Sequence, residues 1–195
     1  MNQLCELTAR SFSRGSFLTF PGLKNRHRLH VKMSFATQQR NGLLLYNGRY
    51  NERFDFVALE TLNSTLRFSF SLGANNMTTH VSTGKVVSDG LWHTVELSYF
   101  NKTATLSVDD CDVIVTLEHM DEFPPDKSCA GSASQTLEKR CDLLTESCHR
   151  FLDLTGPMYL GGLPAPTSSF QIETHDFLGC IKEVYIDHKF LDLNK

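Results

Sequence analysis

Hydrophobic and polar residues alternate along much of this chain. In residues 28–37, RLHVKMSFAT, apolar side chains occupy every second position from Leu29 to Phe35. The same period of two recurs over residues 64–73 and 92–100. Because successive side chains of an extended strand point to opposite faces, this period predicts β-strands with one buried face.

Short clusters of Gly, Asn and Asp separate these segments, as the tight turns of antiparallel hairpins require. Residues 42–48, GLLLYNG, and residues 157–164, PMYLGGLP, are apolar runs closed by glycine, which is typical of strands buried on both faces. Residues 180–193 predict a terminal hairpin that turns at Asp187-His188. With almost no helical periodicity, the chain is expected to be all-β, an antiparallel β-sandwich or jelly roll.

One long segment, residues 117–150, breaks this rhythm. It is polar, cysteine-bearing and longer than an ordinary connection between strands. It has too few apolar residues for a core of its own, so we expect a single domain with an inserted loop. That loop is predicted to carry one short helix, near QTLEKRCDLLTESC, and to be pinned by two disulfides.

The net charge of the chain argues against one class of partner, nucleic acids. The 195 residues include 19 basic and 22 acidic side chains, a net charge of −3, which is too small a bias to favour a nucleic acid partner. The sequence has neither a run of 18 apolar residues nor an N-terminal secretion signal, so this chain is not expected to insert into a membrane itself.

Two features indicate an extracellular protein. Three Asn-x-Ser/Thr tripeptides, at Asn63, Asn76 and Asn101, are candidate N-glycosylation sites. The cysteines lack the paired C-x2-C spacing of zinc sites, so disulfides are favoured over a cytosolic metal site. The six cysteines are Cys5, Cys111, Cys129, Cys141, Cys148 and Cys180. Without a secretion signal of its own, the chain is expected to be a fragment of a longer extracellular protein.

A series of short motifs, in order, resembles a laminin G-like domain: LTFPGL, LHVKMSFATQQRNGLLLYNGR, DFVALE, LRFSFSLG, VSDGLWHTVELSY, TATLSVDD, LDLTGPMYLGGLP and HDFLGCIKEVYID. CELTARSF, NGLLLYNGR and FLDLTGP resemble the domains of Flamingo/CELSR seven-pass atypical cadherins, and FAT-type cadherins are similar to a lesser degree. The resemblance implies a concanavalin-like jelly roll over residues 11–195. Residues 1–10 would be the tail of a preceding EGF-like module or a linker.

The resemblance also implies roles for the cysteines. Cys5 resembles the last cysteine of an EGF-like module and Cys180 the family's C-terminal cysteine, so both would bond to residues outside this chain. The alternative is a Cys5–Cys180 bond within it. The other four cysteines could be paired in three ways. We favour the connectivity with two local disulfides, Cys111 with Cys129 and Cys141 with Cys148.

Many laminin G-like domains hold one calcium ion at the rim of the sandwich, since Ca²⁺ takes oxygen ligands. By resemblance, the ligands here would include the Asp55 carboxylate and the Leu72 carbonyl, with others near IETHDF that the sequence does not place. The alternative is that Asp55 caps a strand entry and binds nothing. The acidic run VDDCD, with Asp109, Asp110 and Asp112, is interpreted as a solvated strand end.

Basic residues of the N-terminal third suggest a second partner. Laminin G-like domains often bind sulfated glycans through such patches, and the alternative here is an ordinary solvated face. The residues are Arg10, Arg14, Lys24, Arg26, His27 and Arg28.

The single tryptophan follows the turn Ser88-Asp89-Gly90, where Gly90 would tolerate a positive φ. In a laminin G-like sandwich, Trp92 would fill the space beneath this turn, and we expect Trp92 and His93 to hold the fold. The alternative, His93 as a general base with Asp89, is disfavoured because no motif supplies a nucleophile.

The pattern is compatible with three classes of function. The favoured one is a non-enzymatic extracellular module that meets protein or glycan partners, flanked by EGF-like modules in a plasma-membrane receptor; the resembled cadherins act in cell-cell adhesion and planar cell polarity. A jelly-roll glycoside hydrolase would need two carboxylates across a cleft, and Glu60 and Glu96 stand alone on their strands. A carrier of an apolar ligand between the sheets could use the fourteen Phe residues, which are more simply the core.

Overall fold

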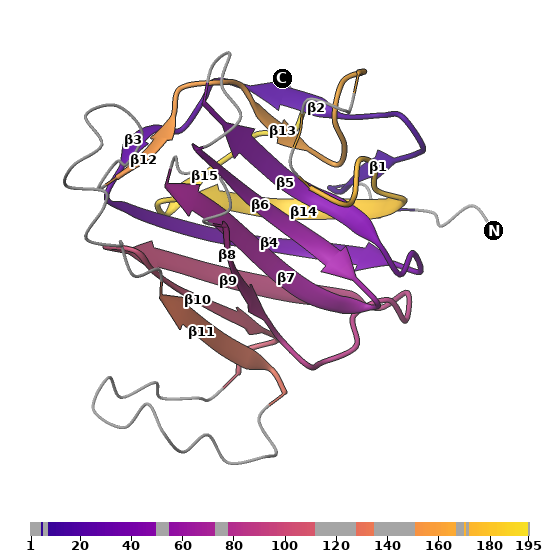
Figure 1. The fold of residues 1–195 in the computed structure, drawn as a ribbon. Helices are drawn as coiled ribbons and strands as arrows, with labels where there is room; N and C mark the ends of the chain where they lie inside the picture. Colours follow the sequence, from indigo (N-terminus) through magenta and orange to yellow (C-terminus); the bar gives the residue numbers. More distant parts are fainter. Residues whose placement is uncertain are drawn as a thin grey trace.

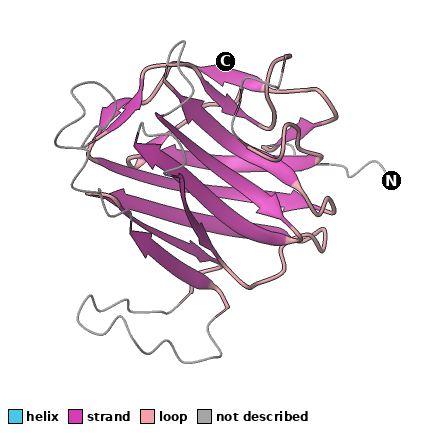
Figure 2. Cartoon of the chain, in the orientation of Figure 1, coloured by secondary structure: helices cyan, strands magenta, loops and turns pink. Residues whose placement is uncertain are grey.

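The structure is a computed structural model that describes residues 5, 8–49, 55–72, 78–111, 128–134, 151–166, 170 and 172–194. Over these ranges the regular elements are all strands, and every strand pairing is antiparallel (Figures 1 and 2). The described part contains no helix of the length and apolarity that would cross a membrane. The predicted all-β antiparallel sandwich is confirmed.

The larger sheet has seven strands in the order β1-β14-β4-β9-β10-β11, with β15 also paired to β14. Its strands are β1 (Arg10–Phe12), β4 (Arg28–Thr37), β9 (Trp92–Phe100), β10 (Thr103–Val108), β11 (Ala130–Ser134), β14 (Gly179–Ile186) and β15 (Lys189–Phe190). The predicted terminal hairpin is confirmed, because Asp187 and His188 both have positive φ and connect β14 to β15.

The second sheet has six strands in the order β2-β13-β5-β6-β7-β8, and β3 and β12 form a separate small pair. Their bounds are β2 (Leu18–Phe20), β3 (Lys24–Arg26), β5 (Gly42–Gly48), β6 (Asp55–Leu62), β7 (Thr65–Leu72), β8 (Thr78–Ser82), β12 (Leu152–Leu154) and β13 (Met158–Leu160). In Figure 1 the β3-β12 pair lies at one side of the sandwich and β1 at the other.

The core lies between the two sheets and follows the predicted alternation. Val95, Leu97 and Tyr99 of β9 are buried, and the residues between them are exposed. Aromatic rings contact one another in this core, for example Phe70 against Tyr99 with ring centroids 5.2 Å apart. The buried Phe residues therefore form part of the core, whereas Phe17, Phe100 and Phe190 are exposed.

The strand β5 is buried along its whole length, as its continuous apolar run predicted. One face contributes Leu44 and Leu45 to the core. The other contributes Leu43 and Tyr46 to a smaller cluster against Leu163 and the partly buried Phe170. The chain beyond β13 therefore covers part of the outer face of the second sheet.

Part of the segment 117–150, which was predicted to be an inserted loop with one short helix, forms a strand. Residues 130–134, AGSAS, form the edge strand β11, which pairs with β10 from Ser107↔Ala130 to Thr103↔Ser134. This strand is built of small residues and has no apolar alternation to reveal it. The helix predicted near QTLEKRCDLLTESC, as well as Asp112, Cys141 and Cys148, lie outside the described residues.

The position predicted for Trp92 is wrong. His93, not Trp92, points into the sandwich, where it is 5% exposed. Trp92 is half-buried on the outer face, with Lys182 Nζ 4.3 Å from its ring centroid. The cause is the period of two, because Val95, Leu97 and Tyr99 place position 93 inward and position 92 outward. Gly90 does have the predicted positive φ, 84°.

Two disulfides join described cysteines. Cys111–Cys129 is confirmed and links the end of β10 to the residue before β11. Cys5 is bonded to Cys180 of β14, so the prediction that both bond to residues outside the chain is wrong and the alternative holds. The short strand β1 is consistent with this bond, since its pairing Ser11↔Cys180 brings the N-terminal part of the chain to β14. β1 begins at Arg10, one residue before the predicted domain boundary, and the EGF-like identity of residues 1–10 stays a prediction.

Candidate functional site

The predicted pair Asp55 and Leu72 lies together at one rim of the sandwich. Asp55 opens β6, Leu72 ends β7, and the two residues are partners in the ladder. Asp55 is 1% exposed. A carboxylate this deeply buried must be compensated by hydrogen bonds or positive charge, because desolvation of an ion is costly.

A second carboxylate, which the sequence analysis missed, comes from β12. The Asp153 N–H donates to Asp55 Oδ2 at 3.0 Å, which brings together residues 98 positions apart. The Asp153 side chain is 15% exposed, and its Oδ2 pairs with Arg49 Nε at 2.9 Å. Its Oδ1 is buried and accepts no hydrogen bond from the described residues. Asp55, Asp153, Arg49 and the Leu72 carbonyl are referred to below as the carboxylate rim.

The prediction that further ligands come from IETHDF is wrong. Thr174 of that segment donates to Glu60 Oε1, through its hydroxyl at 2.6 Å and its N–H at 3.2 Å. Glu60 lies near the end of β6, whereas Asp55 opens that strand. The segment therefore packs at the opposite end of β6 from the carboxylate rim.

A buried amide side chain fixes the position of β12, the strand that carries Asp153. Asn47, fully buried on β5, accepts a hydrogen bond from the Leu23 N–H through Oδ1 at 2.8 Å. Its Nδ2 donates to the carbonyls of Gly156 at 2.8 Å and Gly48 at 3.0 Å. One side chain thus fastens the chain entering β3 to the chain leaving β12, and β12 carries Asp153.

The rim residues fit a calcium ion in the kind of atoms they offer. Two carboxylates and a strand-end carbonyl are oxygen ligands, and a buried carboxylate oxygen without a hydrogen bond is an unfilled acceptor. No group of three or more His, Cys, Asp or Glu side chains suited to a metal occurs in the described ranges. A calcium ion at the rim would therefore depend on carbonyl and water oxygens for the rest of its shell.

The predicted basic patch divides into two groups. Lys24 and Arg26 lie on β3, whose partner β12 carries Asp153, and Arg28 opens β4. Arg26 is paired with Asp187. Arg10 lies on β1, and Arg14 nearby is paired with Asp176 at 3.7 Å while its side chain stays 86% exposed. Of the two groups, β3 is the one that lies next to an element of the rim, because it pairs with β12. His27, which follows β3, is exposed, and its ring contacts Phe151.

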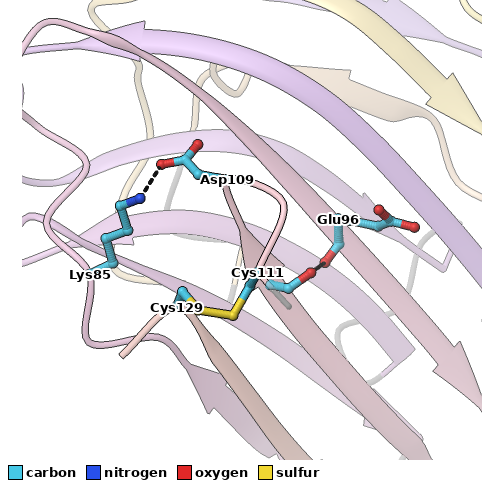
Figure 3. Close-up of a disulfide and its surroundings, with 6 residues drawn as sticks. Lys85, Glu96, Asp109, Cys111 and Cys129 are labelled. Carbon is cyan, nitrogen blue, oxygen red and sulfur yellow. Dashed lines mark hydrogen bonds and ion pairs between the residues drawn. A yellow bond between two sulfur atoms is a disulfide. The ribbon is translucent and has the colours of Figure 1, made fainter. Parts of the chain in front are cut away.

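A second set of carboxylates surrounds His93. Asp89 Oδ1 lies 2.9 Å from His93 Nε2, and Asp109 Oδ2 lies 2.7 Å from His93 Nδ1. Lys85 Nζ reaches the same Asp109 oxygen at 2.7 Å (Figure 3). The Thr94 N–H donates to Asp109 Oδ1 at 2.9 Å. Asp89, His93, Asp109 and Lys85 are referred to below as the His93 network. The interpretation of Asp109 as a solvated strand end is wrong, whereas Asp110 is exposed.

The pKa values of this network reflect its hydrogen bonds. The Leu91 N–H, and then His93, hold the pKa of Asp89 below its usual value. Partial burial raises the pKa of Asp109, but hydrogen bonds from Lys85, His93 and the Thr94 N–H outweigh burial and leave the pKa lowered. Each carboxylate is therefore held ionised by donors that are already in place.

Beside this network lies a polar hollow of about 250 Å³, lined by Thr94, Glu96, Ser107, Asp109, Asp110 and Cys111. Figure 3 shows Glu96 and Asp109 with the Cys111–Cys129 disulfide near this surface. Glu96 pairs with His30 at 2.8 Å and with Lys32 at 3.7 Å, so Glu96, like Asp109 beside Lys85, has a lysine partner. Glu60 belongs to the other sheet, where it is buried and paired with Arg67, so Glu60 and Glu96 form no pair across a cleft.

Comparisons with known proteins agree with this architecture. The Laminin G domain family matches residues 35–189. The chain is 52% identical over 190 residues to the Protocadherin-like wing polarity protein stan of Drosophila melanogaster, covering 97% of this chain and 5% of that protein. It is 40% identical over 205 residues to the human Cadherin EGF LAG seven-pass G-type receptor 3, covering 97% of this chain and 6% of that protein. The chain thus spans a small part of either relative's length.

Solved structures show the same fold. Domains LG4-5 of the mouse laminin alpha1 chain superpose with a TM-score of 0.74 at 27% identity, covering all of this chain and 46% of that one. The LG1-3 region of the laminin alpha2 chain gives a TM-score of 0.64 at 19% identity, covering 97% of this chain and 33% of that one.

Proposed function

This chain belongs to the laminin G domain family, and on that premise we propose that it is an extracellular interaction module of a large cell-surface adhesion receptor. The relatives named as seven-pass receptors and as a wing polarity protein support this proposal. The module acts in cell-cell adhesion and planar cell polarity, next to EGF-like modules of the same chain. Its disulfides fit an oxidising, extracellular environment.

The carboxylate rim is the proposed calcium site. Asp55 and Asp153 provide negative charge, and the Leu72 carbonyl adds a neutral oxygen. The observation that carries this proposal is the buried Oδ1 of Asp153, an acceptor without a donor. When bound, calcium would supply positive charge that can attract an anionic group of a partner. Asp55 and Asp153 would hold the ion, and Asn47 would keep β12, which carries Asp153, in position.

The partner chemistry that best fits the rim is a sulfated glycan. Lys24, His27 and Arg28 are exposed beside the rim, and a sulfate group binds both cationic side chains and a rim-bound cation. Protein partners that present carboxylates are the second class with the same charge requirement. The module is proposed to bind such partners without catalysing a reaction.

Calorimetric titration with calcium tests the site. The wild type should show a saturable heat of binding. It should also melt at a higher temperature with calcium, because a ligand that binds only the folded state stabilises it. Asp55→Asn and Asp153→Asn should lose both effects, whereas Asp109→Asn, a matched carboxylate in the His93 network, should keep them. Equal binding by wild type and Asp55→Asn would refute the site.

Heparin chromatography tests the glycan proposal. Lys24→Glu with Arg28→Glu should elute at lower salt than the wild type, because this pair adjoins the rim. Arg10→Glu with Arg14→Glu makes the same charge change on the β1 side and should elute near the wild type. If both double variants shift equally, retention reflects net charge and the rim is not the binding surface.

A cell aggregation assay with the full-length receptor tests the role in adhesion. Deleting this module should weaken aggregation or partner binding, whereas unchanged aggregation and unchanged partner binding would contradict a direct binding role.

A further inference from the structure

The hairpin between β9 and β10 combines a glycosylation tripeptide with an exposed aromatic ring. Phe100 and Thr103 are partners in the ladder, and Asn101 and Lys102 make the two-residue turn between them. Both turn residues have positive φ, 41° and 70°, which is the pattern of a type I′ turn. The tripeptide Asn101-Lys102-Thr103 therefore begins in the turn and ends on β10.

Phe100 is an unusually exposed ring for a strand residue. It lies on the outer face of the larger sheet, opposite in direction to the buried Tyr99, and is 67% exposed. Leaving a large apolar ring in water has a free-energy cost that is recovered when something covers the ring, at roughly 25 cal/mol per Å². Asn101, the neighbouring residue, is exposed as well, while its backbone N–H is held by the His27 carbonyl at 3.1 Å.

The hairpin between β6 and β7 provides an internal comparison. Asn63-Ser64-Thr65 also begins in a turn with two positive φ values, 51° and 72°. The residue before it is the partly buried Leu62, an aliphatic side chain instead of an aromatic ring. The turn is also hydrogen-bonded to other loops, since the Ser64 N–H donates to the Arg40 carbonyl and the Ser64 carbonyl accepts from the Val87 N–H. The third tripeptide, at Asn76, lies outside the described residues.

We propose that Asn101 carries an N-linked glycan and that the first N-acetylglucosamine of this glycan packs on the Phe100 ring. A sugar tethered to the turn stays close to the ring at little entropic cost. Its C–H groups and acetyl methyl carry slight positive charge and suit the negative face of an aromatic ring. The Thr103 methyl, directly across the ladder, borders the same surface. The glycan is then a structural part of the hairpin. This inference depends on the proposed extracellular location and not on any binding activity of the rim.

The attachment itself is a transfer from a polyprenyl-diphosphate-linked oligosaccharide. The Nδ2 of Asn101 forms a bond to the anomeric carbon of the first sugar, and the bond from that carbon to the diphosphate oxygen breaks. The amide loses one proton, and the lipid diphosphate leaves. No oxidant or reductant takes part.

The test uses the chain secreted from animal cells behind a signal peptide. Peptide mapping should find Asn101 occupied, and an unoccupied Asn101 would overturn the proposal. The glycan is then trimmed enzymatically to a single N-acetylglucosamine. The trimmed protein should melt about 2–4 °C above the Asn101→Gln variant, the shift expected in a domain of this size for one well-packed contact.

A double-mutant cycle isolates the contact, because it cancels what each single change does alone. In a Phe100→Thr background, the trimmed glycan should raise the melting temperature by less than 1 °C. The pair Asn63→Gln and Leu62→Thr is the matched control and should show no coupling. An equal glycan effect with and without Phe100 would overturn the proposal. Should Asn101→Gln fail to fold, amidase removal of the glycan from the folded protein, which leaves a carboxylate at this position, replaces that variant in the comparison.

A spectroscopic measurement distinguishes direct packing from a general effect of glycosylation. The acetyl methyl protons of the sugar on Asn101 should show an upfield ring-current shift that disappears in Phe100→Thr. An acetyl methyl signal at its free-sugar position in the wild type would contradict the packing.

Discussion

The His93 network lies at the start of β9, and the carboxylate rim lies near the end of that strand. Both contain two carboxylates and a cationic side chain, but the carboxylates are hydrogen-bonded differently. At the start of β9, Asp109 bonds to the Thr94 N–H, His93 and Lys85. At its end, burial raises the pKa of Tyr99 to about 12, and the nearby Asp55 charge adds a smaller effect in the same direction.

The difference lies in how the charges are matched. The His93 network has two carboxylates, one lysine and a histidine, with a donor for each carboxylate. The rim has two carboxylates and one guanidinium, and one of its buried carboxylate oxygens lacks a donor. A cluster whose acceptors are all filled stabilises the fold, whereas a cluster with an unfilled buried acceptor is suited to a ligand.

The largest expected loss of stability comes from replacing Asn47, which fixes β12 at the rim. Asn47→Ala leaves the Leu23 N–H and the Gly156 carbonyl without their partner, so the free energy of unfolding should fall by about 3 kcal/mol. Calcium binding should weaken with it, because β12 is no longer fixed. Chemical denaturation measures the first effect and calcium titration the second. Asn41→Ala, which removes an exposed hydrogen bond to the Asn63 N–H, is the control and should cost less than about 0.5 kcal/mol.

A smaller loss is expected at the other end of β9. His93→Gln removes an imidazole that bridges two carboxylates, and the free energy of unfolding should fall by about 2 kcal/mol. Calcium affinity should not change. The exposed pair His30 with Glu96 has the same chemistry at 2.8 Å, so His30→Gln should cost about 0.5 kcal/mol. The comparison fails if His93→Gln weakens calcium binding or if the two variants lose equal stability.

Acid should act on the His93 network through Asp109. Its pKa in the folded state lies below the ordinary value of 3.8, so the stabilisation from its ionised form is present above about pH 4 and is lost as the pH falls through the folded-state pKa. Denaturation midpoints measured from pH 5 to pH 2 should therefore fall less steeply for Asp109→Asn than for the wild type. Lys85→Met, which removes one donor, should give an intermediate slope, and parallel slopes for all three proteins would refute this role.

The smallest expected effect concerns Arg49. Its guanidinium pairs with Asp153 and opposes a divalent cation placed between the two carboxylates. Arg49→Gln should therefore raise calcium affinity about fivefold, the effect of roughly 1 kcal/mol from one like charge a few ångströms away in a water-rich setting. Titration calorimetry measures the change, with Arg14→Gln as a distant control. Weaker binding by Arg49→Gln would show that Arg49 positions Asp153 instead of competing with the ion.

Most strands could be predicted from the sequence because apolar side chains on one face of a sheet repeat with period two. β11 escaped this reasoning because Ala, Gly and Ser carry no hydrophobic pattern, and it is recognised as a strand only through its pairing with β10. The same period predicts that His93 points inward and Trp92 outward. The expectation that Trp92 is buried came instead from the usual preference of tryptophan for the core, and it was wrong.

The candidate site was predicted in part. Asp55 and Leu72 followed from the resemblance, whereas Asp153 is 98 residues from Asp55 in the chain and carries no local signal beyond lying between two buried leucines. Asn47 likewise looks like a turn residue in YNG, although its side chain is buried and bonded to two distant segments, at Leu23 and Gly156. Such long-range contacts depend on how the sheets pack, and the spacing of residues in the sequence does not contain that information.

The most direct test of the rim as a cation site is anomalous diffraction from crystals of this module soaked with terbium, a luminescent substitute for calcium with the same preference for oxygen ligands. The account predicts one strong peak between the carboxylates of Asp55 and Asp153. A peak in the hollow beside Glu96 and Asp109, or no peak at the rim, would contradict it.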